Sequence, residues 1–91
     1  MRTLHDVNRL LLEAIEEPPD TGEEERLDEL AATLWARAER QQPLDPGTNC
    51  RLRHKLRTIA EGTHEARASR LRRARELLDE HAAAHPPRGR A

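Results

Sequence analysis

Leucine and alanine recur at intervals of three and four residues along most of the chain, and prolines interrupt this pattern. Such spacing is that of one face of an α-helix, whereas a strand would show alternation with period two. No segment alternates in that way, and β-branched residues, which favour strands, are sparse. The sequence therefore predicts an all-α fold. We expect a small three- or four-helix bundle built on an antiparallel helical hairpin, which dimerisation could complete.

Four helical segments are predicted, over residues of about 3–17, 22–42, 49–61 and 64–84. Proline pairs follow the first and last segments, and Pro43 ends the second. Thr21 and Glu24 have the spacing of a capping box at the start of the second segment.

We expect the best-packed element to be a hairpin of 22–42 against 49–83, because a short turn joins these two stretches. Residues 1–85 are then a single helical domain, and residues 86–91 are a disordered C-terminal tail.

Gly62 leaves two interpretations of the third and fourth segments open. Glycine often follows the last residue of a helix, so one helix could end here and another begin. Alternatively, one helix over about 49–83 contains the glycine at a cost of about 1 kcal/mol. The apolar stripe that ends at Ile59 continues in phase to Leu71 only if Arg67 lies near the helix–helix contact. We therefore favour a break at Gly62.

The apolar residues can build only a small core. The 91 residues include one aromatic side chain, that of Trp35, and most of the other apolar residues are leucine or alanine. A chain of this size buries only about 60–65% of its unfolded surface, so an isolated monomer would be marginally stable. We therefore expect a partner helix, either in a homodimer or in another protein. The residues expected to line this inter-helix or inter-chain surface are Leu10, Leu12, Leu34, Trp35, Leu71 and Leu78.

Charge is unevenly distributed, although the net charge is only −1. Residues 1–47 hold five arginines against twelve acidic residues, and residues 48–91 hold eleven basic against five acidic residues. The two halves, with net charges of −7 and +6, could neutralise each other on packing, which is the interpretation we favour. Alternatively, the basic half could bind nucleic acid. The residues that could then contact phosphates are Arg51, Arg53, Lys55, Arg57, Arg70, Arg72 and Arg73.

Few residues suit catalysis or metal binding. The four glycines are isolated, so there is no glycine-rich phosphate loop. Cys50 with His54, and His81 with His85, have the spacing of two ligand pairs on helices. An uninterrupted helix over 49–83 cannot bring both pairs together within one chain, although a dimer could. We predict no catalytic residue, cofactor, metal site or small-molecule substrate.

The longest apolar run, Leu10 to Leu12, is far shorter than the ~20 residues that span a bilayer. No signal peptide is recognisable at the start of the chain, so we expect a cytoplasmic protein without a membrane partner. Abundant arginine and alanine, with Lys55 the single lysine, are typical of a GC-rich bacterial genome. The predicted function is a non-catalytic, self-associating module for protein–protein interaction or regulation. The alternative is a helical nucleic-acid-binding protein.

Overall fold

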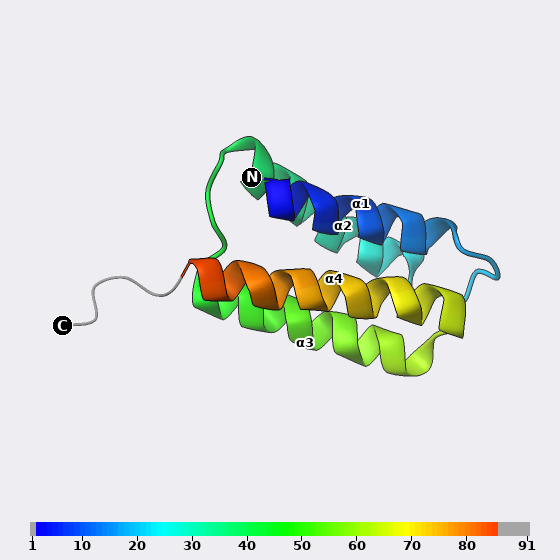
Figure 1. Cartoon of the computed structure of the whole chain (residues 1–91). Coiled ribbons are helices and arrows are strands. Elements are labelled where there is room, and N and C mark those ends of the chain that lie inside the picture. Colours follow the sequence, from blue (N-terminus) through cyan, green and yellow to red (C-terminus); the bar gives the residue numbers. More distant parts are fainter. Residues whose placement is uncertain (1, 86–91) are drawn as a thin grey trace.

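The computed structural model describes residues 2–85, which contain four α-helices (Figure 1). The helices are α1 (Arg2–Glu16), α2 (Glu24–Glu39), α3 (Pro46–Gly62) and α4 (Glu65–Ala84). Consecutive helices run in opposite directions, as in an up-and-down bundle. Within the described range no residue lies in a strand. The predicted all-α bundle is therefore confirmed, and it has four helices.

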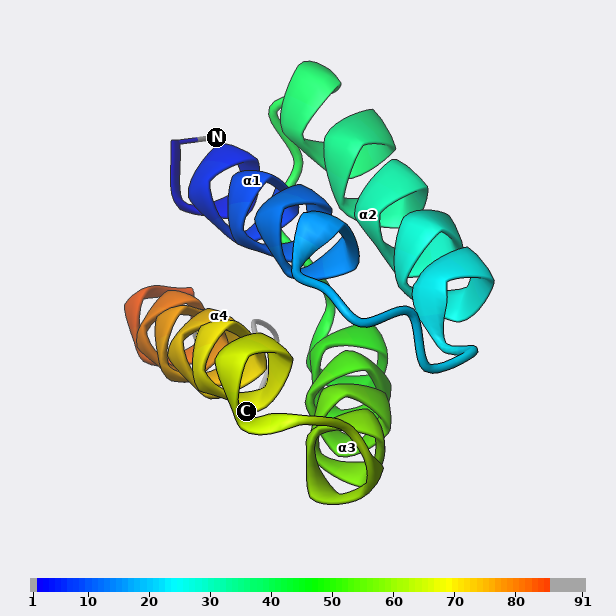
Figure 2. The same ribbon diagram turned by 90° about the vertical axis from the view of Figure 1, so that its right-hand side faces the viewer.

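Two helical hairpins make up the bundle. α1 packs against α2, α3 packs against α4, and the two hairpins meet through α1 and α4. By contrast, α2 and α3 make at most marginal contact, and Figure 2 shows them as separate ribbons. The predicted hairpin of 22–42 against 49–83 is therefore wrong. Residues 40–45 do not make a tight turn between two packed helices but carry the chain from one hairpin to the other (Figure 1).

Helix boundaries differ from the predicted ones where local caps override the apolar pattern. α2 ends at Glu39, and Gln41 two residues later has a positive φ of 54°, a common conformation just after a helix. α3 begins at Pro46 rather than near residue 49, because the Asp45 carboxylate accepts a hydrogen bond of 3.0 Å from the Thr48 N–H. Proline suits the first helical position, where its missing N–H costs nothing.

The predicted break at Gly62 is confirmed, since α3 ends at this residue. The next residue, Thr63, is extended, and α4 begins at Glu65. His64 precedes α4, and its ring nitrogen Nδ1 accepts a hydrogen bond of 3.4 Å from the Arg67 N–H.

The core lies between the inner faces of the four helices. Its fully buried leucines are Leu4, Leu11, Leu27, Leu34, Leu56, Leu71 and Leu78. One buried asparagine links the helices within each hairpin. Asn8 of α1 donates to the Ala31 carbonyl at 2.6 Å, and Asn49 of α3 donates to the Leu78 carbonyl at 3.1 Å. None of the helices described here has the length and apolar character needed to cross a membrane.

Candidate interaction surfaces

Of the six apolar residues expected at an inter-helix or inter-chain surface, three lie in the core. Leu34, Leu71 and Leu78 are completely buried against helices of their own chain. Leu10 is half-buried and packs against the edge of the core. These four residues therefore belong to contacts within the bundle, and a second chain cannot reach the three that are fully buried.

Leu12 and Trp35 are the two large hydrophobic residues that remain exposed among residues 2–85, with exposed fractions of 44% and 51%. The Trp35 ring lies beside α1, with its centroid 5.2 Å from that of His5. Leu12 follows His5 by two helical turns and shares its side of α1. Exposed Ala32 precedes Trp35 by one turn. We call the surface formed by His5, Leu12, Ala32 and Trp35 the Trp35 face.

Charged side chains around the Trp35 face are distributed unequally along α1. Arg2 and Arg9 are exposed in its first half, and Arg9 lies 3.5 Å from the Asp6 carboxylate. Exposed Glu16 lies at the other end, beside the start of α2, where exposed Asp28 adds a second carboxylate. Exposed Glu39 lies 3.2 Å from His5 at the same end as these arginines, so this end carries both signs of charge, whereas the other end is acidic.

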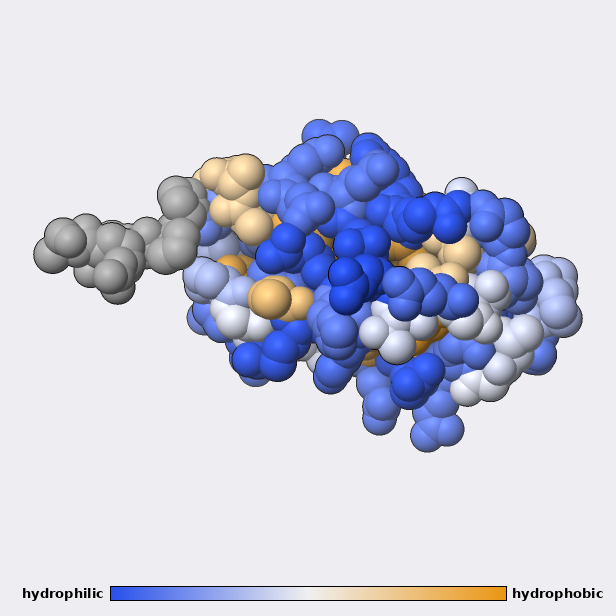
Figure 3. Space-filling model, turned by 90° about the horizontal axis from the view of Figure 1, so that it is seen from below, coloured by the Kyte–Doolittle hydropathy of each residue, from blue (hydrophilic) through white to orange (hydrophobic). Residues whose placement is uncertain are grey.

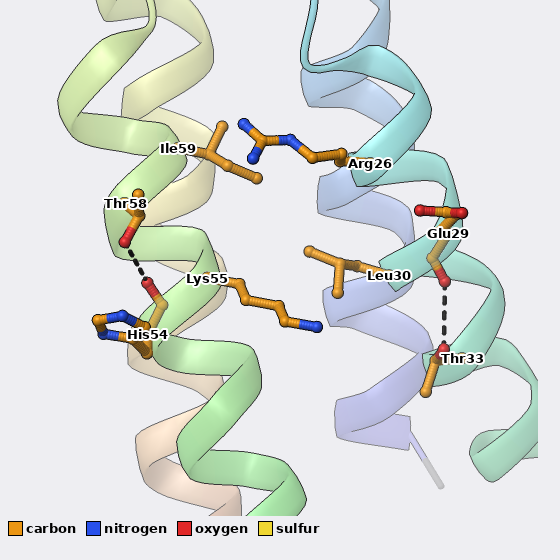
Figure 4. Close-up of a pocket in the computed structure, with 8 residues that line it drawn as sticks. All are labelled: Arg26, Glu29, Leu30, Thr33, His54, Lys55, Thr58 and Ile59. Carbon is orange, nitrogen blue, oxygen red and sulfur yellow. Dashed lines mark hydrogen bonds between the residues drawn. The ribbon is translucent and has the colours of Figure 1, made fainter.

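A hollow of about 400 Å³ separates α2 from α3 (Figure 4). Its lining residues are Arg26, Glu29, Leu30 and Thr33 from α2 and His54, Lys55, Thr58 and Ile59 from α3. Leu30 and Ile59 lie at its base and are 8% and 4% exposed. Arg26 extends toward Ile59, and Lys55 extends toward Leu30, so both long side chains reach across the hollow.

The polar groups of the hollow differ in whether they have partners. Thr33 donates to the Glu29 carbonyl at 3.2 Å, and Thr58 donates to the His54 carbonyl at 3.0 Å, so both hydroxyl donors are used within their own helices. Neither Arg26 nor Lys55 forms an ion pair with any residue in the described range 2–85. The hollow therefore combines an apolar base with two cations that lack a carboxylate partner.

The seven residues predicted to contact phosphates divide into two groups. Four form ion pairs within the chain: Arg53 with Asp79, Arg70 with Glu13 and Glu17, Arg72 with Glu65, and Arg73 with Glu76. Arg51, Lys55 and Arg57, all on α3, have no ion pair with a described residue. The surface that includes α3 is mainly hydrophilic, with small hydrophobic areas between the polar side chains (Figure 3).

Arg67 is a polar centre of the bundle whose role sequence analysis did not identify. Its side chain is completely buried near the N-terminal end of α4. Nε donates to the Ala14 carbonyl at 2.8 Å, and Nη2 donates to the carbonyls of Ile15 and Glu17 at 3.2 and 3.1 Å. The guanidinium therefore binds carbonyls at the end of α1, where helix geometry leaves carbonyls short of donors, although the Ala14 carbonyl also accepts the Glu17 N–H at 3.2 Å.

The same guanidinium binds the turn before α2. Nη1 donates to the Thr21 hydroxyl at 2.8 Å and to the Glu23 carboxylate at 2.9 Å, and it lies 2.8 Å from the Glu24 carboxylate. These groups and the three carbonyls at the end of α1 form what we call the Arg67 cluster. The sequence indicated only that Arg67 lies on the apolar face, because it occupies the position that keeps the stripe from Ile59 to Leu71 in phase.

The two glutamates of the cluster are held ionised. The pKa of Glu24 is lowered to about 2, mainly because its carboxylate accepts a hydrogen bond from the Thr21 N–H. The pKa of Glu23 is also lowered, chiefly by the Thr21 hydroxyl. The predicted capping box is thus half formed: Glu24 accepts from the Thr21 N–H at 2.9 Å, whereas the Thr21 hydroxyl donates to Glu23.

A buried histidine lies at the opposite end of α4. His81 is 2% exposed, and its Nε2 accepts a hydrogen bond of 3.2 Å from the Leu44 N–H in the segment between α2 and α3. Burial lowers the pKa of His81, which keeps the ring neutral and able to accept this bond. The His85 ring lies 4.3 Å from it.

In the described part of the chain, no three His, Cys, Asp or Glu residues are grouped as metal ligands. Cys50 and His54 are exposed on α3, and His81 and His85 lie at the end of α4. Because α3 and α4 run antiparallel, both pairs lie toward the same end of their hairpin, yet they do not form such a group among the described residues.

Comparison with known proteins identifies a family. The model of a family of unknown function, DUF7553, matches residues 1–83. No curated protein and no solved structure matches the chain. The match spans α1, α2 and α3 and nearly all of α4, and the chain therefore belongs to DUF7553.

Proposed function

We propose that this member of DUF7553 is a non-catalytic interaction module that self-associates as a homodimer through the Trp35 face. The observation that carries the proposal is the exposure of Leu12 and Trp35 on one side of the α1–α2 hairpin. Other large apolar side chains of the described range are buried or partly buried in the core. Aromatic residues exposed in this way are typical of the centres of protein interfaces.

A two-fold dimer uses this surface efficiently. In an isologous interface each residue occurs twice, so Leu12 and Trp35 of both copies are covered together. Burial of apolar surface contributes about 25 cal/mol per Å². A small bundle whose core contains no Phe, Tyr or Trp has a particular need for such burial.

Charge complementarity favours an antiparallel arrangement of the two copies. A two-fold axis perpendicular to the helices places the α1 helices antiparallel to each other. Arg2 and Arg9 of one copy then face the acidic end of the other, which contains Glu16 and Asp28. Opposite charges paired at the rim of an interface guide association and fix its register.

Sedimentation equilibrium at micromolar concentration tests the proposal. We expect the wild-type chain to have twice its mass of 10.4 kDa, and Trp35→Glu to be a helical monomer. Thr33→Glu is the matched control, because it adds the same charge to an exposed position of α2 that is turned by about 160° from Trp35. A monomeric wild type, or a Trp35→Glu variant that dimerises as tightly as Thr33→Glu, would show the proposal to be wrong.

Nucleic-acid binding is the alternative function, and its support is weaker. Four of its seven predicted phosphate contacts are engaged by carboxylates of the same chain. Titration with duplex DNA at two salt concentrations distinguishes the alternatives, because phosphate binding weakens steeply as salt rises. Tight, salt-dependent binding that Arg51→Gln and Arg57→Gln reduce would favour the alternative.

A further inference from the structure

We propose that the hollow between α2 and α3 binds an amphipathic anion, a small molecule with an alkyl chain and one anionic head group. The site is separate from the Trp35 face. Trp35 lies on the side of α2 that contacts α1, whereas the residues of the hollow face α3. The inference therefore does not depend on dimerisation.

The dimensions of the hollow favour a small ligand over a docked helix. Its volume of about 400 Å³ lies within the range of roughly 300–1,000 Å³ found for small-molecule sites. On α2 it extends only from Arg26 to Thr33, which corresponds to about two helical turns. A docked helix usually places anchors over a longer groove, at positions i, i+3 or i+4, and i+7.

The walls of the hollow suit an alkyl chain. Leu30 and Ile59 are at its base, and the methylene groups of Arg26 and Lys55 lie across it (Figure 4). Long basic side chains commonly cover apolar surface with their methylene groups while their charged ends stay in water. An alkyl chain between α2 and α3 would take over this covering role, and the side chains that it displaces are flexible.

The charges of the hollow suit a single anionic head. Arg26 and Lys55 come from facing helices and have no carboxylate partner among the described residues, whereas Glu29 contributes one negative charge to the lining. Arg26, Lys55 and Glu29 together give the lining a net charge of +1. Because the threonine hydroxyls already donate within their helices, Arg26 and Lys55 are the donors free to bind the head group.

The separation of α2 and α3 makes this site accessible without unfolding. The two helices make at most marginal contact, so a ligand between them would break no helix–helix packing. The remaining pairs, α1 with α2, α1 with α4, and α3 with α4, hold the bundle together independently of the hollow.

The test uses decanoate as the probe and the full chain labelled with ¹⁵N. We expect saturable binding, with amide shifts centred on Leu30 and Ile59. The double variant Arg26→Gln and Lys55→Gln should bind roughly ten- to a hundredfold more weakly, because each cation makes a charge-assisted hydrogen bond. Arg57→Gln is the matched control, since it removes a cation of α3 that does not line the hollow, and its affinity should equal that of the wild type. Glu29→Gln should bind more tightly.

Several outcomes would overturn the proposal. One is the absence of saturable decanoate binding. Equal binding of decyltrimethylammonium would show that the anionic head is not recognised, and equal binding of acetate would show that the alkyl chain is not. Amide shifts centred on Leu12 and Trp35 would place the probe on the Trp35 face. Unchanged affinity in the double variant, with helicity retained in its circular dichroism spectrum, would exclude the two cations as ligands.

Discussion

The Arg67 cluster and the hollow between α2 and α3 both contain basic side chains between helices. In the cluster the basic side chain is buried and fully bonded, whereas in the hollow the two basic side chains have no carboxylate partner among the described residues. Arg67 has no exposed surface and hydrogen bonds to five residues from α1 and the turn that follows it. Arg26 and Lys55 have no carboxylate partner in the described chain, and the helices that carry them stay apart. A cation can be enclosed between helices only where enough acceptors converge on it.

The source of the acceptors explains this difference. The end of α1 exposes carbonyls that no intrahelical N–H can reach, and Glu23 and Glu24 follow at the start of α2. The hollow, by contrast, lies along the middle of two helices, where backbone carbonyls are already bonded within the helix. Glu29 is the single carboxylate in its lining. The end of a helix can therefore surround a guanidinium, but the middle of a helix cannot.

Removing the Arg67 guanidinium is expected to have the largest effect on stability. In Arg67→Met, the Ile15 and Glu17 carbonyls lose the donor that Arg67 supplies, and the Glu23 carboxylate loses one donor and keeps the Thr21 hydroxyl. We expect the free energy of unfolding to fall by about 3–5 kcal/mol, as for other buried ion pairs that lose one member. Urea denaturation followed by circular dichroism measures the loss. A decrease of less than about 1 kcal/mol would mean that the cluster contributes little net stability.

Acid should weaken the Arg67 cluster without any mutation. Because the folded pKa of Glu24 is about 2, below its ordinary value of 4.5, the unfolded state binds protons first as the pH falls. The stability from Glu24 is therefore complete above pH 4.5 and is lost as the pH falls toward 2. Urea midpoints measured across this range should fall less steeply in Glu24→Gln than in the wild type. Equal slopes would contradict the assignment.

His81 contributes a separate loss at higher pH. Its pKa is lowered from 6.5, so its neutral form stabilises the fold fully above that pH and this contribution declines as the pH falls below it. A loss of stability just below pH 6.5 therefore reports on His81 near the end of α4, and a loss below pH 4.5 reports on the Arg67 cluster at its start.

The smallest change in stability is expected from a substitution in the hollow. Lys55→Glu places a carboxylate in the lining that also contains Arg26, and an exposed pair of this kind changes stability by less than about 1 kcal/mol. The same urea experiment checks this value. A change of more than about 2 kcal/mol in either direction would show that Lys55 has a structural role like that of Arg67.

Local patterns predicted the helices, because apolar spacing, prolines and Gly62 act within a few residues of each other. Which helices pack together depends on contacts between distant residues. The leucine pattern of α2 and α3 contained no indication that polar side chains such as Lys55 and Thr58 would lie between them. Arg67 was identifiable only by its phase, since the hydrogen-bond partners of its side chain are 44 to 53 residues away.

The candidate surfaces were predictable only in part, because burial also depends on contacts between distant residues. Leu12 and Trp35 were included among six apolar residues, but local spacing did not separate them from leucines such as Leu34 and Leu78, which the folded chain encloses. The arginines predicted to bind phosphate could not be separated either, because ion pairs such as that of Arg70 with Glu13 join distant parts of the chain.

The position of the Arg67 cluster also bears on the kinetics of folding. Each helical hairpin closes over a short stretch of chain and can form quickly. The bonds of Arg67 join the end of α1 to the start of α4, so they require that both hairpins are present and docked. Interactions that form after the transition state slow unfolding and leave the folding rate nearly unchanged. We predict that the Arg67 bonds form after the transition state, so that Arg67→Met speeds unfolding more than it slows folding.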